Sequence, residues 1–431
     1  MTMKLRILLI LTVALGQMFW TSCGHYSCTD TFSANNCSTG GGGGGGVGTG
    51  GGGGGGGSSA AAAFAFAIDQ TLGSIDGYTL TAGSSSSFQA TTGYVGPTIP
   101  TGDPGVGMVV VQKKFLYAIF GPENLIYGWA ISSSGTLSTL AGFPVSVNPT
   151  LSGTIPVTNY HQVSVITNPT GTLLFVAQAL FNQILVFQVG STGGLTEGPP
   201  VSTGADSPIN LGMDGLGKYL YVTEDPNLST HTATKTAAYV IGTTGTLAAV
   251  PGSPFAFPMW EVQGDLSGQY LIGISGNSTA LSGVDDKNIY VFAITQSPAV
   301  AAGALTAVAG SPFVTTYSPF NLAVNPVGEF AYTFSLNPSD TGNNPTEAFA
   351  LNQATGAISI VPGSPFSNLY TGGNGQFEQS GTYLFSHSGD LSLATSVQLA
   401  PLVTDSTGAL TQPFSNVILS TSGYWAVTEP Q

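Results

Sequence analysis

The hydrophobic pattern of the chain repeats a unit of four short β-strands. The clearest copy runs from Pro319 to Phe366, where the apolar runs LAV, FAYTF, AFAL and ISIV are separated by NPVGE, a polar insert and NQATGA. Pro presets φ and Gly supplies the positive φ that tight turns need, so these interruptions predict turns. Aromatic and aliphatic runs between turns predict half-buried strands. The unit therefore predicts a four-stranded antiparallel sheet.

Degenerate copies of this unit fill most of the chain. The motif GSPF recurs at 252–255, 310–313 and 363–366. A period of about 50 residues in an all-strand pattern is typical of a β-propeller, and residues 60–431 are long enough for seven such blades. The first turn of the unit carries a glycine at Gly171, Gly217, Gly268, Gly328, Gly381 and Gly423.

The two ends of this region predict how the ring of blades closes. AFAFAID at 63–69 matches the second strand of the unit, and no first strand precedes it. SNVILSTSG at 415–423 matches the missing first strand, so we expect the C-terminal strand to pair into the N-terminal blade. Closure of this kind removes exposed sheet edges. YWAVTE at 424–429 is surplus to this scheme, and either competes for the second-strand place or extends the closing strand.

The repeats resemble a known family. KYLYVTE at 218–224 is close to the strand motif of the lactonase-type, YVTN-related seven-bladed β-propeller family, and the resemblance covers roughly residues 60–431. It implies seven four-stranded blades around a central channel, with His and other polar residues lining an active site on the innermost strands. It is specific for fold and weak for activity, because the family contains many members without known chemistry.

The N-terminal 22 residues have the pattern of an export signal. Lys4 and Arg6 precede the apolar run 7–15, which is too short to span a bilayer. The small residues before Cys23 resemble a bacterial lipoprotein signal, although Trp20 stands where Leu is usual. We expect a lipid anchor at Cys23 on a periplasmic, outer-membrane or cell-surface protein. The alternative is simple secretion with an unmodified cysteine.

Residues 23–59 predict a flexible tether. Cys28 and Cys37 are the other cysteines of the chain, and in an oxidising compartment they could form a small disulfide loop. Residues 39–59 are nearly all glycine, which is typical of a flexible coil rather than a phosphate-binding loop.

Charge excludes several kinds of partner. The net charge is −14, and removal of Lys4 and Arg6 leaves −16, with five lysines and no arginine. Nucleic acid is therefore excluded, because its phosphates need cationic side chains. Phosphorylated sugars are disfavoured for the same reason, since bidentate Arg is the usual phosphate ligand. The phosphorylated sugar lactone that the family resemblance implies is thus a poor substrate candidate.

Polar residues recur at the start of the innermost strands, seven positions before each turn glycine. In the blade that lacks the glycine, the equivalent position is Val106. The position predicts a ring of hydrogen-bonding groups at one mouth of the channel, with one ionisable member. That ring either orients a small polar ligand or simply holds water. Its polar members are Ser164, Asn210, Glu261, Asn321, Asn374 and Asn416.

Glu261 and His161 are the candidate catalytic residues. A carboxylate buried among amides should have a raised pKa, which suits a general base, and His161 lies just before a ring strand. His387 and Asp390 flank a short turn at the same mouth. No nucleophile-elbow serine and no metal-ligand histidine spacing is present.

Three long inserts, 224–236, 275–288 and 335–346, fall between the second and third strands of consecutive blades. Such loops share one face, so they could form a rim around a binding surface. The acidic residues of these inserts are Glu224–Asp225, Asp285–Asp286 and Asp340. They weakly indicate a calcium site, and the alternative is that they form exposed acidic turns.

These patterns predict an exported, monomeric β-propeller without a cofactor. We expect it to bind a small polar ligand, or a protein or glycan partner, at the channel mouth. One alternative is a hydrolase or cyclase that acts on an unphosphorylated lactone. Another is a structural envelope protein.

Overall fold

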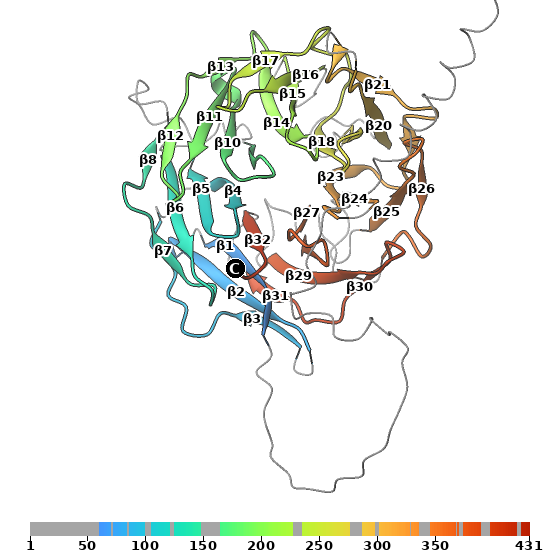
Figure 1. The fold of residues 1–431 in the computed structure, drawn as a ribbon. Coiled ribbons are helices and arrows are strands. Elements are labelled where there is room, and N and C mark those ends of the chain that lie inside the picture. Colours follow the sequence, from blue (N-terminus) through green and yellow to red (C-terminus); the bar gives the residue numbers. More distant parts are fainter. Residues whose placement is uncertain are drawn as a thin grey trace, which may run out of the picture. The chain divides into compact units, whose positions relative to one another are not determined.

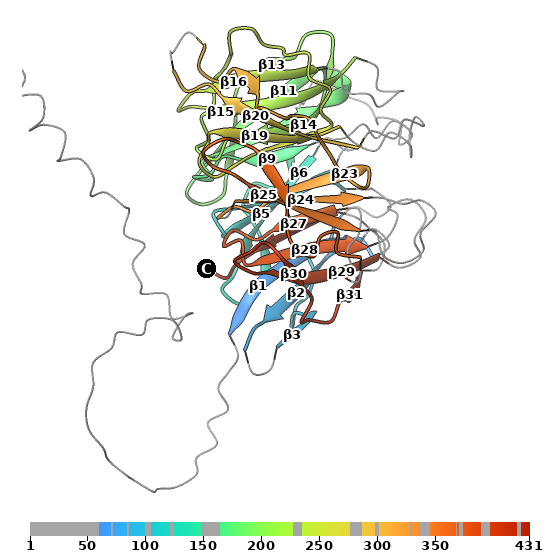
Figure 2. The same ribbon diagram turned by 90° about the vertical axis from the view of Figure 1, so that its right-hand side faces the viewer.

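The computed structural model describes residues 60–431, apart from 70–71, 84–85, 100–104, 121–124, 148–163, 227–234, 276–286, 298–300, 328, 336–344, 368, 370–373, 389–396 and 420–423. The strands form seven antiparallel sheets that radiate as blades around a common axis (Figure 1), which Figure 2 shows from the edge. The predicted all-β, seven-bladed propeller is confirmed. Among the described residues there is no α-helix, and no helix there is long and apolar enough to cross a membrane.

Each blade contributes one strand to each of four concentric layers. The first layer, around the axis, contains β32 (Trp425–Thr428), β4 (Gly105–Val111), β9 (Val165–Thr167), β14 (Ser207–Met213), β18 (Glu261–Gly264), β23 (Pro319–Val324) and β27 (Asn374–Phe377). The second contains β1 (Ala61–Asp69), β5 (Phe115–Phe120), β10 (Leu173–Gln178), β15 (Tyr219–Asp225), β19 (Tyr270–Ile274), β24 (Phe330–Ser335) and β28 (Tyr383–Ser388).

The outer layers are shorter and more exposed. The third contains β2 (Ser74–Thr81), β6 (Leu125–Ile131), β11 (Gln183–Val189), β16 (Lys235–Ile241), β20 (Asn288–Ile294), β25 (Thr346–Leu351) and β29 (Val397–Thr404). The fourth contains β3 (Ser87–Ala90), β7 (Leu137–Thr139), β12 (Leu195–Glu197), β17 (Leu247–Ala249), β21 (Leu305–Ala307), β26 (Ile358–Ile360) and β30 (Leu410–Thr411). Short return segments pair with the starts of four third-layer strands: β8 (Val145–Ser146), β13 (Val201–Ser202), β22 (Phe313–Val314) and β31 (Val417–Leu419). One 3-10 turn, η2 (Ala179–Phe181), follows β10.

The hydrophobic core lies between the blades. Second-layer strands such as β5 and β10 are buried at every position, because a blade packs on each of their two faces. Third-layer strands such as β6 and β20 instead alternate buried and half-buried residues along part of their length. The buried side chains form seven clusters, each shared by two neighbouring blades.

Glycines in the outer hairpins let adjacent blades approach closely. Gly408 has φ +82°, and a Cβ there would lie 2.4 Å from the ring of Phe330 in the preceding blade. The hydroxyl of Tyr332 donates to the Gly408 carbonyl at 2.9 Å, so the same glycine is fixed by packing and by a hydrogen bond. Tyr117 and Tyr221 make the same bond to hairpin glycines of the next blade.

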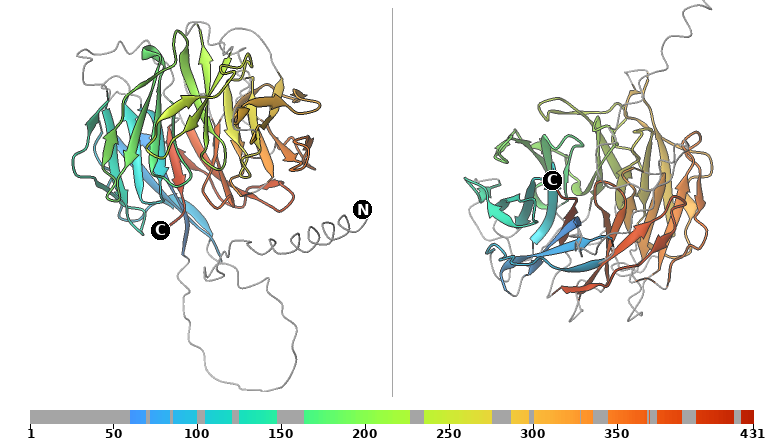
Figure 3. Two further views of the ribbon diagram at one scale, coloured as in Figure 1. Left: turned by 45° about the horizontal axis from the view of Figure 1, so that its top comes forward. Right: turned by 60° about the horizontal axis from the view of Figure 1, so that its bottom comes forward.

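The predicted closure of the ring by pairing of the N- and C-terminal strands is confirmed, but the closing strand is a different segment from the one expected. The C-terminal strand β32 pairs antiparallel with β1 and supplies the missing inner strand of the first blade (Figures 1 and 3). The predicted closing segment, 415–423, is wrong as an inner strand. Its described part forms β31, which pairs with β29 at the outside of the seventh blade.

Side chains at the ends of the inner strands shape the turns into the second layer. The Asp214 carboxylate accepts the backbone N–H groups of Lys218 (2.7 Å) and Tyr219 (2.6 Å). Asn168 makes equivalent bonds in the preceding blade, and Glu378 does so in the seventh. These turns define the turn end of the axis. The opposite end, where the inner strands begin, is called the ring end.

Candidate functional site at the ring end

Five of the predicted ring residues occupy one equivalent position of the inner strands. Asn210 lies opposite Thr223, Glu261 opposite Ile274, and Asn321 opposite Phe334. Ser164 and Asn374 take the same place, since the Ser164 carbonyl accepts the N–H of Ala177 and Asn374 lies opposite His387.

The other two positions of the ring differ from expectation. In the second blade Gly107, and not Val106, lies opposite Ile119, because the strand bulges between Gly105 and Gly107. In the first blade the position belongs to Tyr424, whose carbonyl accepts the N–H of Ile68 at 3.1 Å. Asn416 is not a ring residue. It precedes β31 and hydrogen-bonds Gln398 on the outer layers of the seventh blade.

Four ring side chains tie the inner strands of the third to seventh blades together, each strand to the next. Ser164 Oγ accepts the N–H of Leu211 (3.1 Å), and Asn210 Oδ1 accepts that of Val262 (3.4 Å). Glu261 Oε2 and Asn321 Oδ1 continue the series, with the N–H groups of Leu322 (3.0 Å) and Gly375 (2.8 Å). The strands of adjacent blades cannot pair as a sheet, so these side chains satisfy backbone donors that would otherwise face the axis.

Glu261 is the ionisable member of this series. Besides the Leu322 N–H, its carboxylate accepts the Asn321 amide on both oxygens (3.2 and 3.0 Å) and the Gln263 amide (3.3 Å). These donors favour the charged form, but burial in the wall of the axis disfavours it more strongly. The net effect raises the pKa of Glu261 from 4.5 to about 7. The residue keeps some exposed surface, so a group with this pKa can meet a ligand or a water molecule.

Gln263 is a supporting residue that the sequence did not single out. Its amide donates to the Leu322 carbonyl (2.7 Å) and accepts the Val324 N–H (2.9 Å), which fixes β18 against β23. The same nitrogen touches Glu261. The sequence could have indicated Gln263, because it lies two residues after Glu261 and alternate residues of a strand share a face.

The predicted histidines do not join Glu261 in the described part of the chain. His161 lies outside the described residues, as do Asp390, Cys23, Cys28 and Cys37. His387 lies within β28 rather than in a loop, and its side chain is fully buried. Neither ring nitrogen has a hydrogen-bond partner among the described residues, and burial lowers the pKa of His387 to about 4, so it is neutral at physiological pH.

The acidic residues of the first insert are buried, which corrects the expectation of exposed acidic turns. Glu224 and Asp225 belong to β15 and are 2% and 1% exposed. Burial and the nearby Asp206 raise the pKa of Glu224 to about 7, while Asp206 itself pairs with Lys235 at 2.6 Å. Asp285, Asp286 and Asp340 lie outside the described residues, and within the described ones no group of three or more metal-ligating side chains gathers.

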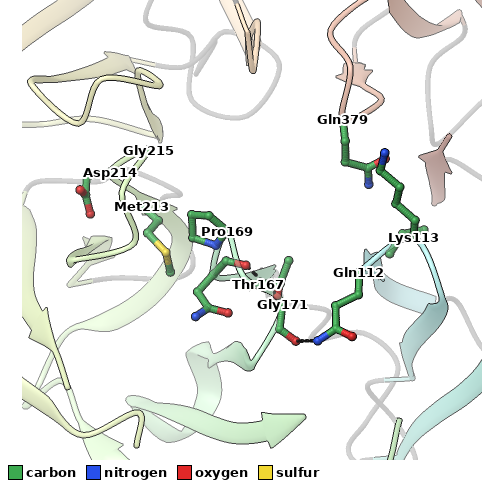
Figure 4. Close-up of a pocket in the computed structure, with 11 residues that line it drawn as sticks. Gln112, Lys113, Thr167, Pro169, Gly171, Met213, Asp214, Gly215 and Gln379 are labelled. Atoms are coloured by element: carbon green, nitrogen blue, oxygen red, sulfur yellow. Dashed lines mark hydrogen bonds between the residues drawn. The ribbon is translucent and has the colours of Figure 1, made fainter. Parts of the chain in front are cut away.

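A second hollow opens at the turn end of the axis. A cavity of about 540 Å³ lies among the turns of the second, third, fourth and seventh blades. Val110, Pro169 and Met213 give it an apolar wall, and Gln112 and Gln379 line it from the second and the seventh blade (Figure 4). None of these residues was singled out by the sequence.

Comparison with known proteins finds similarity in structure only. No family model and no curated protein matches the sequence. A solved protein from Lactobacillus plantarum superimposes with a TM-score of 0.60 at 13% identity, over 86% of this chain and 100% of that one. The periplasmic gluconolactonase of Pseudomonas aeruginosa gives 0.56 at 13% identity, over 86% and 99%. A candidate 6-phosphogluconolactonase from Bacteroides fragilis gives 0.59 at 13% identity, over 85% and 98%. The chain therefore has the lactonase-type, seven-bladed β-propeller fold, and its function must be argued from its own residues.

Proposed function

We propose that the ring end binds a small, uncharged, polar ligand that contacts Glu261. The observation that carries this proposal is the Glu261 carboxylate, which is oriented by Asn321, Gln263 and the Leu322 N–H, belongs to a half-buried residue at the axis, and has a pKa of about 7. A group that exchanges its proton near neutral pH can accept a hydrogen bond from a ligand hydroxyl or donate one to a carbonyl.

The ligand is uncharged because the chain lacks the usual means of holding an anion. The sequence has no arginine after Arg6. Phosphate and carboxylate groups are normally recognised by guanidinium groups, so a phosphorylated sugar is a poor fit. The amides and hydroxyl of the ring instead suit sugars and their lactones. The export signal at 1–22 and the periplasmic location of a structural neighbour support a protein that works outside the cytoplasm, anchored through Cys23.

Lactone hydrolysis is the second candidate, and the pKa of Glu261 favours it. In that reaction Glu261 takes a proton from a water molecule, whose oxygen attacks the lactone carbonyl. The acyl–oxygen bond of the ring breaks, and the departing alkoxide recovers the proton to give a hydroxy acid. A base with a pKa near the working pH suits this step.

One set of assays separates these functions. Unphosphorylated lactones are offered to the full-length protein for hydrolysis, and the matching sugars for binding, detected by saturation-transfer NMR. Glu261→Gln is compared with Glu329→Gln, a control at an exposed carboxylate of the turn end. Binding without turnover, which falls in Glu261→Gln and not in Glu329→Gln, supports the binding protein. Turnover lost in the same variant supports the hydrolase. Binding that Glu261→Gln leaves intact, but that trimming of the three inserts abolishes, contradicts the proposal in favour of a rim site.

A further inference from the structure

We infer that the turn end of the axis is a second, separate binding site, for a small neutral hydroxylated ring such as a monosaccharide. This inference does not depend on the function proposed for the ring end. The cavity of about 540 Å³ falls within the usual size of small-molecule sites, which is about 300–1,000 Å³.

The charged groups of the cavity already have partners within the protein. Lys113 pairs with Glu429 of the C-terminal segment. The Asp214 carboxylate accepts hydrogen bonds from the backbone N–H groups of Leu216, Lys218 and Tyr219. An ionic ligand would have to break one of these arrangements, so the lining favours a neutral one.

Two amides remain available to a ligand. Gln112 donates through Nε2 to the Gly171 carbonyl at 3.0 Å, and Gln379 accepts through Oε1 from Thr428 (3.2 Å) and from the Glu429 N–H (3.3 Å). These bonds orient both side chains at the cavity (Figure 4). No described residue pairs with Gln112 Oε1 or Gln379 Nε2, so one acceptor and one donor are left. A hydroxylated ring satisfies both, and its C–H face fits the wall of Val110, Pro169 and Met213.

The backbone at Gln112 supports a functional role. Gln112 and Lys113 have φ of +55° and +58°, a left-handed conformation that suits Asn-Gly in a two-residue turn. Side chains of this size are uncommon there, and such strain concentrates at functional sites. A need for the Gln112 amide at the cavity would explain why this strained backbone conformation is kept.

The test is saturation-transfer NMR on the full-length protein with glucose, galactose and N-acetylglucosamine at millimolar concentration. Gln112→Gly removes the amide and relieves the strained φ, Gln379→Leu removes the donor, and Met213→Trp fills the cavity. Gln89→Leu, at an exposed glutamine of β3, is the matched control.

We expect at least one sugar to give a signal that all three cavity variants reduce severalfold. To exclude binding at the ring end, these variants are also made together with Glu261→Gln. In that background the signal should persist with Gln89→Leu, and each of the three cavity substitutions should reduce it. Gln112→Gly should lose the signal while keeping or raising the melting temperature, which separates a binding role from a structural one. The inference is overturned if no sugar binds, if the signal survives in Met213→Trp, or if only Glu261→Gln removes it.

Discussion

The amide of Asn321 donates to both carboxylate oxygens of Glu261, at 3.2 and 3.0 Å, and its own oxygen accepts the Gly375 N–H at 2.8 Å. One asparagine therefore links three successive blades and fixes the orientation of the only carboxylate among the described ring residues. This relationship explains how the Glu261 carboxylate keeps one geometry while burial holds its pKa near 7.

Stability should depend on pH through Glu261. Its pKa in the folded protein, about 7, lies above the ordinary value of 4.5, so the folded state holds this proton more tightly. The contribution of Glu261 to stability is therefore full below about pH 4.5 and is lost as the pH rises to about 7. We expect the free energy of unfolding of Glu261→Gln, relative to that of the wild type, to rise by a few kcal/mol between pH 4.5 and pH 8. Urea denaturation at both pH values measures the gain, and a pH-independent difference would contradict it.

The hydroxyl of Tyr332 should contribute measurably to the packing of the sixth and seventh blades. Tyr332→Phe removes the hydrogen bond to the Gly408 carbonyl and leaves that buried acceptor without its donor. The expected loss is about 1–2 kcal/mol in the free energy of unfolding. Tyr317→Phe, at a side chain 38% exposed, is the control and should change little. Equal effects of the two variants would show that the inter-blade bond is not stabilising.

Glycines with positive φ in the outer turns of the blades should tolerate substitution only where space is open. Gly408 and Gly142 have similar φ values, +82° and +86°, but a Cβ at Gly408 would lie 2.4 Å from Phe330, whereas nothing lies within 4 Å of one at Gly142. Gly142→Ala should cost about 1 kcal/mol from backbone strain alone. Gly408→Ala should cost about 2–4 kcal/mol, because overpacking adds to the strain. Chemical denaturation gives both values, and equal losses would rule out the packing term.

Because β32 closes the ring, a charged substitution in β32 should destabilise the protein far more than one in β31. Ala426 is fully buried in the closing strand, whereas Ile418 in β31 is 68% exposed. Ala426→Asp should destabilise the protein by more than about 3 kcal/mol, because it buries an unpaired charge. Ile418→Asp should stay within about 0.5 kcal/mol of the wild type. The reverse order in thermal denaturation would restore 415–423 as the closing strand.

The sequence predicts the blades well because turn chemistry is local. Gly171 and Gly217 each adopt the positive φ that their motifs imply, and counting back from them finds Ser164 and Asn210 on the ring. Pairing partners are not local, which is why 415–423 was misplaced. An apolar run before a glycine fits an inner strand, but the segment TQPF at 411–414 is a degenerate copy of the GSPF motif and marks 417–419 as a return segment.

Contacts between blades also lie beyond the sequence pattern. Gln263 reaches Leu322 and Val324 only because β18 and β23 pack side by side. Glu224 reads as the start of a polar insert, yet β15 continues through it and buries it. The cavity at the turn end combines turns from four blades, so no single repeat could reveal it.

The most direct test of the account is a carbon-13 NMR titration of the full-length protein labelled at the glutamate carboxyls, with and without a lactam analogue of a sugar lactone. We predict one resonance that titrates near pH 7, is absent from Glu261→Gln and moves when the lactam is added. The pKa of Glu224 is also raised to about 7, so its resonance should shift with pH in the same range. Its chemical shift should not change when the lactam is added, and it therefore serves as the internal control. A Glu261 resonance that titrates near pH 4.5, or whose chemical shift does not change when the lactam is added, would contradict a ligand site at the ring end.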